Sequence, residues 1–271
     1  MAISKTDLLS IKNFSSLTGI KQSTLRYYDD LGLFSPAARG ENGYRYYSPQ
    51  QILTINSINL LHELDMPIRQ ITHIQSHRSP ELMCEIFEEK ENALEAELIK
   101  MERSFNVVKT LKRMIQTGLA AEENVIETKY LDDMPIVIGP VNDFEGTNYF
   151  YDAFVKFCSD AKQYRIDMRL PVGGMFEDFD AFAEYPGQPT RFFSVDPKGL
   201  DKRPAAKYLS AFQRGYYGET GDLIERMKTY LSENGLITVG PVYNIYLLDE
   251  LSIDDPHNYL MHATVEVSQS R

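Results

Sequence analysis

The sequence predicts a multidomain α and α+β protein, built from an amino-terminal winged helix-turn-helix, a long antiparallel dimerisation helix and a duplicated strand-helix-strand-strand domain. Three observations predict this order. Short amphipathic helical patterns separated by turn residues fill residues 1–79, and residues 80–117 continue in one unbroken helical pattern. After a linker at residues 118–124, strand-like runs and two helical patterns alternate through residues 125–271.

The first segment has the pattern of two helices joined by a tight turn. Residues 12–17 predict the first helix, Thr18-Gly19 interrupts it, and residues 22–31 predict the second, with Leu25 and Tyr28 on its buried face. The second helix of such a motif enters the major groove of DNA, so its exposed side chains meet base edges first and then the backbone. The predicted base contacts are Gln22, Ser23 and Thr24, and the predicted backbone contacts are Arg26 and Tyr27.

A wing is predicted after the second helix. Gly40-Glu41-Asn42-Gly43 supplies the turn residues of a hairpin. The strand that follows offers the guanidinium of Arg45 and the hydroxyls of Tyr44 and Tyr46, groups that hydrogen-bond phosphate oxygens. We therefore expect these three side chains to contact the DNA backbone.

Three more helices are predicted. Ser48 is expected to cap the third helix with Pro49 at its first position, and Pro67 to open a short fourth helix. The fifth spans residues 80–117, which contain no glycine and no proline after Pro80. Apolar residues recur there at spacings of three, four and seven, as in a coiled coil: Phe87, Leu94, Leu98, Met101, Phe105, Val108 and Ile115.

The length of this helix predicts a second chain as its partner. Its 38 residues would form a rod roughly 57 Å long, too long to bury its apolar seam against a small domain of the same chain. We expect an antiparallel coiled coil in a homodimer. A long helix that packs on its own carboxy-terminal domain remains an alternative, because Glu91 and Lys112 occupy seam positions.

The carboxy-terminal domain is predicted from its strand pattern. A strand, a turn and an amphipathic helix occur twice, at residues 136–164 and 208–231, which indicates a duplication. Strand-like runs cover residues 125–130, 136–141, 173–179, 191–195, 208–212, 242–248 and 260–267, and the two helical patterns cover residues 149–164 and 220–234.

Charge is distributed unevenly along the chain. The net charge is −11. Residues 1–75 hold seven Lys and Arg against six Asp and Glu, and residues 118–271 hold 14 against 25. An acidic domain repels phosphates and attracts cations, so the two ends of the chain are expected to bind partners of opposite charge.

The amino-terminal region resembles the MerR family of transcription regulators over about residues 9–75. Three runs carry the resemblance: Ser10-Ile11-x-x-Phe14-Ser15-x-x-Thr18-Gly19-Ile20, Leu25-Arg26-Tyr27-Tyr28-Asp29-x-Leu31-Gly32-Leu33, and Gly43-Tyr44-Arg45-Tyr46-Tyr47. The resemblance implies a homodimer on a palindromic operator in double-stranded promoter DNA. Such a dimer distorts an overlong promoter spacer when effector binds, so that RNA polymerase engages both promoter elements. One departure is Asp65-Met66-Pro67, where the family has a glycine-containing turn.

Residues 125–267 resemble the gyrase-inhibitor-like effector domain of the multidrug-sensing, BmrR-like branch of this family. The resemblance rests on Tyr208, Phe212, Gly215-x-Tyr217 and the run Gly240-Pro241-Val242-Tyr243-Asn244-Ile245-Tyr246. It implies binding of lipophilic, mostly cationic, aromatic small molecules by stacking and cation–π contacts. By position, the candidate ligand-binding residues are Tyr151, Tyr208, Tyr217, Asn244, Tyr246 and Tyr259.

Asn244 is a departure from the resemblance. Multidrug-sensing relatives commonly have a buried glutamate there, and an amide supplies no charge to a cation. The charge is then expected from another carboxylate, such as Glu145, Glu177 or Asp178, or from the acidic field of the domain. Some gyrase-inhibitor-like domains resemble hydrolases that use a glutamate–tyrosine pair. Because the glutamate is missing at this position, we predict that the protein is not an enzyme.

Three other functions remain as alternatives. A metal sensor would use Cys84 with His73 and His77. A stand-alone hydrolase would turn over an electrophilic lipophilic substrate without DNA, and an interaction protein would bind gyrase. We expect no cofactor and no bound metal. The sequence contains neither a signal peptide pattern nor a long apolar run, which predicts a cytoplasmic protein without membrane contact.

Overall fold

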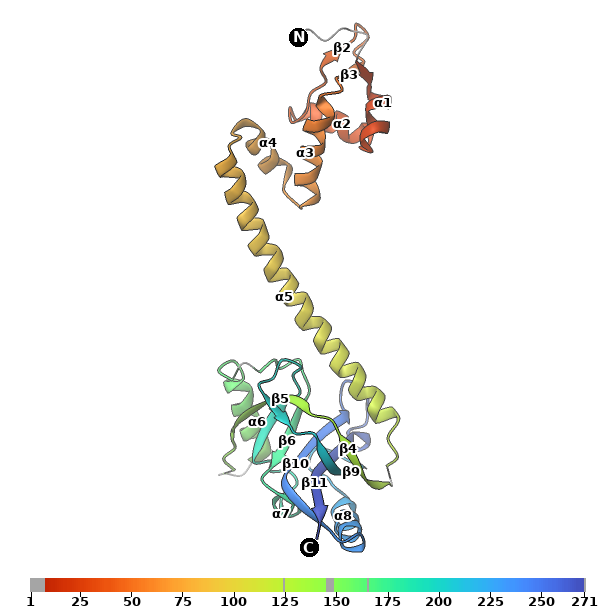
Figure 1. The fold of residues 1–271 in the computed structure, drawn as a ribbon, viewed down its shortest axis with the longest axis vertical. Coiled ribbons are helices and arrows are strands. Elements are labelled where there is room, and N and C mark those ends of the chain that lie inside the picture. Colours follow the sequence, from red (N-terminus) through yellow and green to blue (C-terminus); the bar gives the residue numbers. More distant parts are fainter. Residues whose placement is uncertain (1–7, 124, 145–148, 165, 271) are drawn as a thin grey trace. The chain divides into compact units, whose positions relative to one another are not determined.

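The chain forms two compact units, Met1–Glu97 and Leu98–Arg271. A computed structural model describes residues 8–123, 125–144, 149–164 and 166–270 (Figure 1). Among these residues, no helix has both the length and the apolar character needed to cross a membrane.

The first unit contains a helix-turn-helix and a small sheet, as predicted. Ser10 caps the first helix by accepting a hydrogen bond from the Asn13 N–H at 3.2 Å, and Gly19 ends it with a φ of 74° that favours glycine. The helices are α1 (Ile11–Thr18), α2 (Gln22–Asp30), α3 (Gln51–Glu63) and α4 (Ile68–Ser76). The strands, paired in the order β1-β3-β2, are β1 (Leu9–Ser10), β2 (Ala38–Arg39) and β3 (Arg45–Tyr47).

The start of the third helix differs from the prediction. Ser48 and Pro49 lie in a turn before α3, in which the Gln51 N–H donates to the Ser48 carbonyl at 3.0 Å. The Ser48 N–H donates to Oε1 of Gln51 at 3.0 Å, so the two residues close the turn between them. Ser48 is buried at the end of β3, and no side chain caps α3. The helix therefore begins two residues later than its sequence signals suggest.

Three stacked rings join the wing to the helix-turn-helix. The ring centroids of Phe14 and Tyr47 are 4.6 Å apart, and those of Phe34 and Tyr47 are 5.6 Å apart. All three rings are buried, together with Leu25 and Ile55. Because Tyr47 lies on β3 and Phe14 on α1, this core fixes the wing strand against the first helix.

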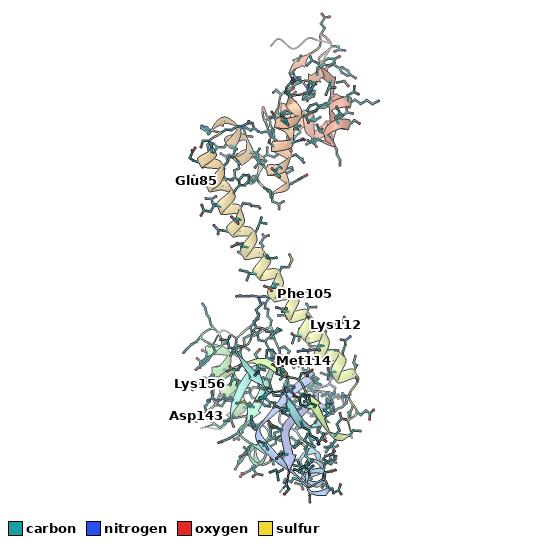
Figure 2. All side chains as sticks on the ribbon, in the orientation of Figure 1. Glu85, Phe105, Lys112, Met114, Asp143 and Lys156 are labelled. Carbon is teal, nitrogen blue, oxygen red and sulfur yellow. The ribbon has the colours of Figure 1, made fainter. Side chains whose placement is uncertain are left out.

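One long helix, α5 (Pro80–Leu119), continues through both units. Its central apolar residues are exposed, among them Leu98, Met101 and Phe105, and Phe105 is labelled in Figure 2. Its last turns are packed differently, since Met114 belongs to a buried cluster with residues of the sheet that follows. The apolar residues of the predicted seam are therefore exposed from Phe87 to Val108, and packing within the chain applies to the end of the helix.

The second unit is an antiparallel sheet of eight strands in the order β4-β9-β11-β10-β6-β7-β5-β8. Its strands are β4 (Ile126–Leu131), β5 (Met134–Val141), β6 (Val172–Phe176), β7 (Arg191–Ser194), β8 (Asp201–Arg203), β9 (Ala206–Arg214), β10 (Leu236–Leu248) and β11 (Leu260–Gln269). Its helices are α6 (Tyr149–Asp160), α7 (Phe179–Glu184) and α8 (Leu223–Glu233), and Pro256–Asn258 form a 3-10 turn.

The strand order confirms the predicted duplication. The first half runs β5-α6-β6-β7 and the second runs β9-α8-β10-β11, and in each half the third strand lies between the other two. The halves join where β10 pairs with β6, with Asn244 opposite Gly174. Short elements were missed in the sequence, among them β8 and α7 of this unit. They contain three and six residues, too few to show a periodicity.

Candidate nucleic-acid interface and ligand cavity

The second helix of the helix-turn-helix presents the side chains predicted to contact DNA. Ser23, Arg26 and Tyr27 are exposed, Gln22 and Thr24 are half-buried, and the intervening Leu25 and Tyr28 are buried in the core. No side chain caps the start of α2. The first N–H groups of the helix are therefore free of a side-chain acceptor, and a phosphate oxygen is a suitable partner for them.

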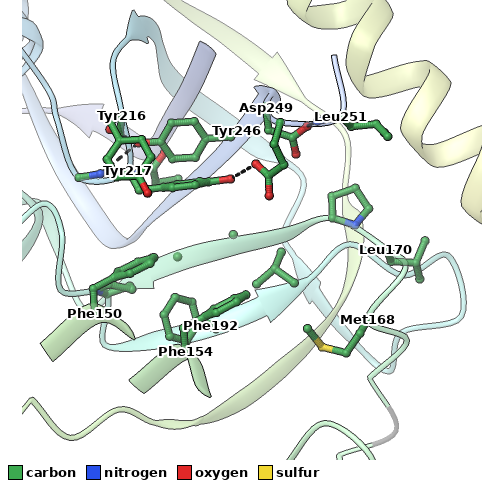
Figure 3. A pocket seen from close by; sticks show the side chains of 18 of the residues that line it. Phe150, Phe154, Met168, Leu170, Phe192, Tyr216, Tyr217, Tyr246, Asp249 and Leu251 are labelled. Carbon is green, nitrogen blue, oxygen red and sulfur yellow. Dashed lines mark hydrogen bonds between the residues drawn. The ribbon is translucent and has the colours of Figure 1, made fainter. Parts of the chain in front are cut away.

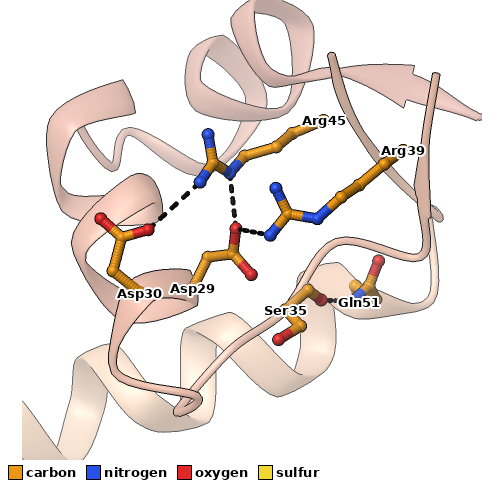
Figure 4. Close-up of polar contacts among 6 residues, drawn as sticks. All are labelled: Asp29, Asp30, Ser35, Arg39, Arg45 and Gln51. Atoms are coloured by element: carbon orange, nitrogen blue, oxygen red, sulfur yellow. Dashed lines mark hydrogen bonds and ion pairs between the residues drawn. The ribbon is translucent and has the colours of Figure 1, made fainter. Parts of the chain in front are cut away.

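The wing is tied to this helix by an ion-pair network. Nε of Arg45 and Nη2 of Arg39 each lie 2.5 Å from Oδ2 of Asp29, and Nη2 of Arg45 lies 3.2 Å from Oδ1 of Asp30 (Figure 4). Burial raises the pKa of Asp29, but the hydrogen bond from Arg45 and the charges of Arg39 and Arg45 outweigh it, so the pKa lies below its ordinary value. The carboxylate is thus ionised at neutral pH.

This network changes what is expected of the wing side chains. The guanidinium of Arg45 is directed at Asp29 and Asp30. Tyr44 is exposed, and Tyr46 is half-buried. Arg45 therefore positions the wing on α2. Of the three predicted phosphate contacts, Tyr44 has the most exposed side chain.

The second unit contains a cavity of about 610 Å³ with aromatic walls. Phe150 and Phe154 come from α6, Phe192 comes from β7, and Tyr216 and Tyr217 follow β9 (Figure 3). Rings therefore reach the cavity from both halves of the duplicated domain. Its lining also includes Leu111, Met168, Arg169, Leu170, Pro171, Asn244, Tyr246, Asp249, Glu250 and Leu251.

Tyr217 is the centre of the aromatic wall. Its ring stacks on Phe150, with centroids 6.1 Å apart, and meets Tyr246 edge-on at 4.6 Å. Its hydroxyl donates a hydrogen bond to Oε2 of Glu250 at 2.5 Å. Burial and this hydrogen bond raise the pKa of Tyr217, so the phenol stays protonated as a donor.

The charged groups of the cavity wall are two acids and one arginine. Burial raises the pKa of Asp249 above its ordinary value. Arg169 is already paired: its Nε lies 2.9 Å from Oδ1 of Asp167, and its Nη2 lies 2.6 Å from Oδ2 of Asp167. Within the described part of the chain, neither Asp249 nor Glu250 forms an ion pair with a basic residue.

Asn244 lies in the wall where β10 crosses from one half of the domain to the other. Its side chain is buried, and its Oδ1 accepts no hydrogen bond from the described residues. A buried carbonyl oxygen without a donor costs free energy. A ligand that brings a donor to Asn244 would remove that cost.

Comparison with known proteins identifies the first unit. Residues 9–78 match the family model described as MerR HTH family regulatory protein. They form a MerR-type helix-turn-helix domain. The Multidrug-efflux transporter 2 regulator of Bacillus subtilis (strain 168) is 27% identical and covers 94% of this chain and 95% of its own. The transcriptional regulator BrlR of Pseudomonas aeruginosa is 42% identical over 25% of this chain and 26% of its own.

Similar solved structures include a cryo-EM structure of an EcmrR–DNA complex. It is 17% identical, covers 96% of this chain and all of its own, and has a TM-score of 0.40. The family match covers the amino-terminal sequence, and the similarity to the Bacillus subtilis regulator extends beyond the MerR-type domain into the second unit.

The structure brings four of the six predicted ligand residues to one cavity. Tyr151, Tyr217, Asn244 and Tyr246 line it, and the Tyr151 hydroxyl is 2.7 Å from that of Tyr216. Tyr208 and Tyr259 do not line it, which corrects the prediction for these two residues. The Tyr208 hydroxyl donates to the Pro204 carbonyl and its ring lies under Arg203, and Tyr259 packs behind Tyr217. Both are core tyrosines.

Sequence reasoning missed the phenylalanines and the two acids of the cavity. Phe150 and Phe154 are four residues apart on α6, a spacing that places both on one face and could have indicated them. Asp249 and Glu250 follow directly after the predicted strand 242–248. Glu177 and Asp178, the carboxylates considered instead, do not line the cavity, and Asp178 caps α7. Glu145 lies outside the described residues.

The residues considered for a metal sensor do not form a cluster. The rings of His73 and His77 stack with centroids 4.4 Å apart, and Cys84 is an exposed free thiol. Within the described residues, no group of three or more His, Cys, Asp or Glu side chains is arranged to hold a metal ion.

Proposed function

We propose that the protein is a MerR-type transcription regulator that binds promoter DNA as a homodimer and senses lipophilic, mostly cationic, aromatic compounds. Bound compound changes the shape of the dimer, which distorts the promoter spacer and lets RNA polymerase engage both promoter elements. Tyr151, Tyr217, Asn244 and Tyr246 contact the compound. The protein acts in the cytoplasm.

The observation that carries this proposal is the aromatic cavity in a chain that also has a MerR-type domain. The cavity of about 610 Å³ is large enough for a compound of several fused or linked rings. Among the described residues, eight aromatic rings line it: Phe150, Tyr151, Phe154, Phe176, Phe192, Tyr216, Tyr217 and Tyr246. Stacking on such rings tolerates many ligand shapes, which suits a sensor of varied compounds. The relative that is similar over nearly the whole chain is named as a multidrug-efflux transporter regulator, and this supports the proposal.

Separate segments of the chain bind DNA, form the dimer and bind the effector. Gln22, Ser23 and Thr24 meet base edges, and Arg26, Tyr27 and the wing side chains Tyr44, Arg45 and Tyr46 lie near phosphates. Residues 1–79 bind DNA, residues 80–117 form the dimer, residues 118–124 link, and residues 125–271 bind effector. The exposed apolar residues of central α5 support the dimer.

The test is a titration of the purified protein with a panel of fluorescent aromatic cations, alone and on DNA. The DNA is a duplex that the protein itself selects from a random library. We expect saturable binding of several dyes, with a dissociation constant that changes when DNA is bound, because the two sites bias one equilibrium.

Each outcome has a defined consequence. Absence of saturable binding across the panel would contradict the sensor function. Dye binding without any selected DNA sequence would contradict the regulator function. A control variant, Tyr217→Ala, should weaken every dye and leave DNA binding without dye unchanged, because it removes the central ring of the cavity.

A further inference from the structure

The aromatic cavity carries a net negative charge on its wall. Of its charged lining residues, Arg169 is held in a two-point contact with Asp167, which lies outside the lining. The charges of Arg169 and Asp167 cancel locally. Asp249 and Glu250 have no such basic partner in the described residues. A ligand in the cavity therefore meets two uncompensated carboxylates.

Hydrogen bonds hold both carboxylates in place. Glu250 accepts the hydrogen bond from Tyr217, so its carboxylate is held next to the central ring of the wall (Figure 3). Oδ1 of Asp249 accepts from the Leu251 N–H at 3.1 Å, which fixes the turn after β10. Leu248, the last residue of β10, is buried and anchors this turn to the core.

Asn244 is an independent sign that a ligand belongs here. More than nine-tenths of this residue is buried, and its Oδ1 lacks a donor within the described residues. It lines the same cavity as the two acids. An amide oxygen accepts a hydrogen bond or faces the positive end of a ligand, and it does not repel a cation.

We propose that Asp249 and Glu250, at the end of β10, are the residues that make the cavity select a cation, and that Asn244 contributes only an uncharged acceptor. The inference rests on the proposed function of the cavity. The chemical class is a lipophilic aromatic cation whose rings lie among the phenylalanines and tyrosines and whose charge lies near Glu250. The negative charge is thus supplied from the turn after the strand and not from the strand itself.

Opposite charge on one molecular shape gives the sharpest test. Tetraphenylphosphonium and tetraphenylborate have the same four rings around one centre and differ in the sign of the charge. Calorimetric titration of the full-length protein with each ion at pH 7.5 should show saturable binding of the phosphonium and none of the borate. Glu250→Gln keeps the hydrogen-bond acceptor for Tyr217 and removes the charge. It should weaken phosphonium binding about tenfold.

A second variant tests the other carboxylate, and a matched control tests a carboxylate outside the cavity. Asp249→Asn keeps the acceptor for the Leu251 N–H and should also weaken the phosphonium several-fold. Glu177→Gln removes an exposed carboxylate that does not line the cavity, and it should leave the affinity unchanged. Thermal unfolding midpoints within a few degrees of wild type would show that each variant is folded.

The possible results separate this inference from the function on which it rests. If wild type binds both ions equally and Glu250→Gln changes neither, the carboxylates do not select charge, and the cavity is still a site for aromatic compounds. If Glu177→Gln weakens the phosphonium as much as Glu250→Gln does, the acidic field selects the cation and the assignment is wrong. If wild type binds neither ion, this inference is contradicted, and the dye panel decides whether the sensor function is contradicted with it.

Discussion

At the scale of single residues, buried charge decides what the wing can do. Asp29 is almost fully buried at the end of α2, and an isolated carboxylate there would cost several kcal/mol. Arg39 and Arg45 neutralise it from two strands of the wing. The pattern Tyr44-Arg45-Tyr46 suggested a set of phosphate contacts, but the structure shows that its arginine has an internal partner.

Arg45→Ala should therefore destabilise the first unit by about 1–3 kcal/mol at pH 7, because Asp29 then keeps a single ion pair in the described residues, with the exposed Arg39. The pKa of Asp29 is lowered in the folded protein, so the stability that it contributes is present above pH 3.8 and is lost as the pH falls through the folded pKa. Chemical unfolding from pH 7 to pH 2.5 should show the difference between variant and wild type shrinking below pH 3.8. Arg39→Ala, the control, should cost less than about 1 kcal/mol. An Arg45→Ala variant as stable as wild type would contradict this role.

At the scale of elements, the end of β10 connects the cavity to α5. Leu247 and Leu248 pack against Gly118 of α5, and the next two residues, Asp249 and Glu250, line the cavity. Leu111, one side chain of the same helix, also reaches the cavity. A ligand at this turn would contact two segments that are packed on each other, and we expect it to affect the position of the helix.

Gly118→Ala tests this contact. In an ordinary helix the change would stabilise by about 1 kcal/mol. Here the new Cβ would lie 2.8 Å from Cγ of the buried Leu248, closer than packing allows. We expect a net destabilisation of the second unit by about 1–2 kcal/mol, measured by chemical unfolding. Thr117→Ala, at the neighbouring exposed position, should change stability by less than about 0.5 kcal/mol. A Gly118→Ala protein more stable than wild type would show that α5 and β10 are not closely packed at Gly118.

The central part of α5 offers a second element-scale prediction. Leu98 and Phe105 are 69% and 64% exposed. A partner helix that packs on them would remove this apolar surface from water and so stabilise the dimer. Phe105→Asp should place a charge in that interface and convert the dimer to single chains at micromolar concentration, as measured by light scattering after gel filtration. Ala96→Asp introduces the same charge on the outer heptad face and should leave the dimer intact. Equal dissociation by both variants would contradict the predicted seam.

At the scale of the whole molecule, the chain contains two units with different chemistry. Residues 1–97 carry the MerR-type domain, and residues 98–271 contain the cavity and most of the excess acid. Residues 1–75 hold seven Lys and Arg against six Asp and Glu, so we expect DNA affinity to come from paired domains and well-placed contacts. Each unit has its own buried cluster, which allows each to unfold cooperatively by itself.

Calorimetry of the full chain should therefore show two unfolding transitions. An aromatic cation at 100 times its dissociation constant should stabilise only the transition of the second unit, by about 2.7 kcal/mol. Arg45→Ala should lower the midpoint of the first unit's transition only. This shift identifies which calorimetric peak belongs to which unit. A single transition whose midpoint rises when ligand is added would mean that the two units unfold together.

The sequence by itself determined the elements whose signals are local. The turn at Thr18-Gly19, the spacing of Leu25 and Tyr28, and the unbroken pattern after Pro80 predicted α1, α2 and α5 because cap, periodicity and propensity act within a few residues. The repeat of strand and helix predicted the duplicated domain for the same reason. The resemblance to an effector domain led to the candidates Tyr151, Tyr217, Asn244 and Tyr246, all of which line the cavity.

Only the tertiary structure decided which side chains meet across the duplicated domain. Tyr208 and Tyr259 resemble Tyr217 and Tyr246 as residue types, yet only the last two line the cavity. Tyr208 lies on β9 and Tyr246 on β10, where strand register sets the direction of the side chain. Tyr217 and Tyr259 lie in connecting segments, whose path depends on packing. The pairing of β10 with β6 places Asn244 in the wall, and the turn after Leu248 brings Glu250 to the Tyr217 hydroxyl 33 residues away. Contacts between residues so far apart depend on packing, and no local pattern encodes them.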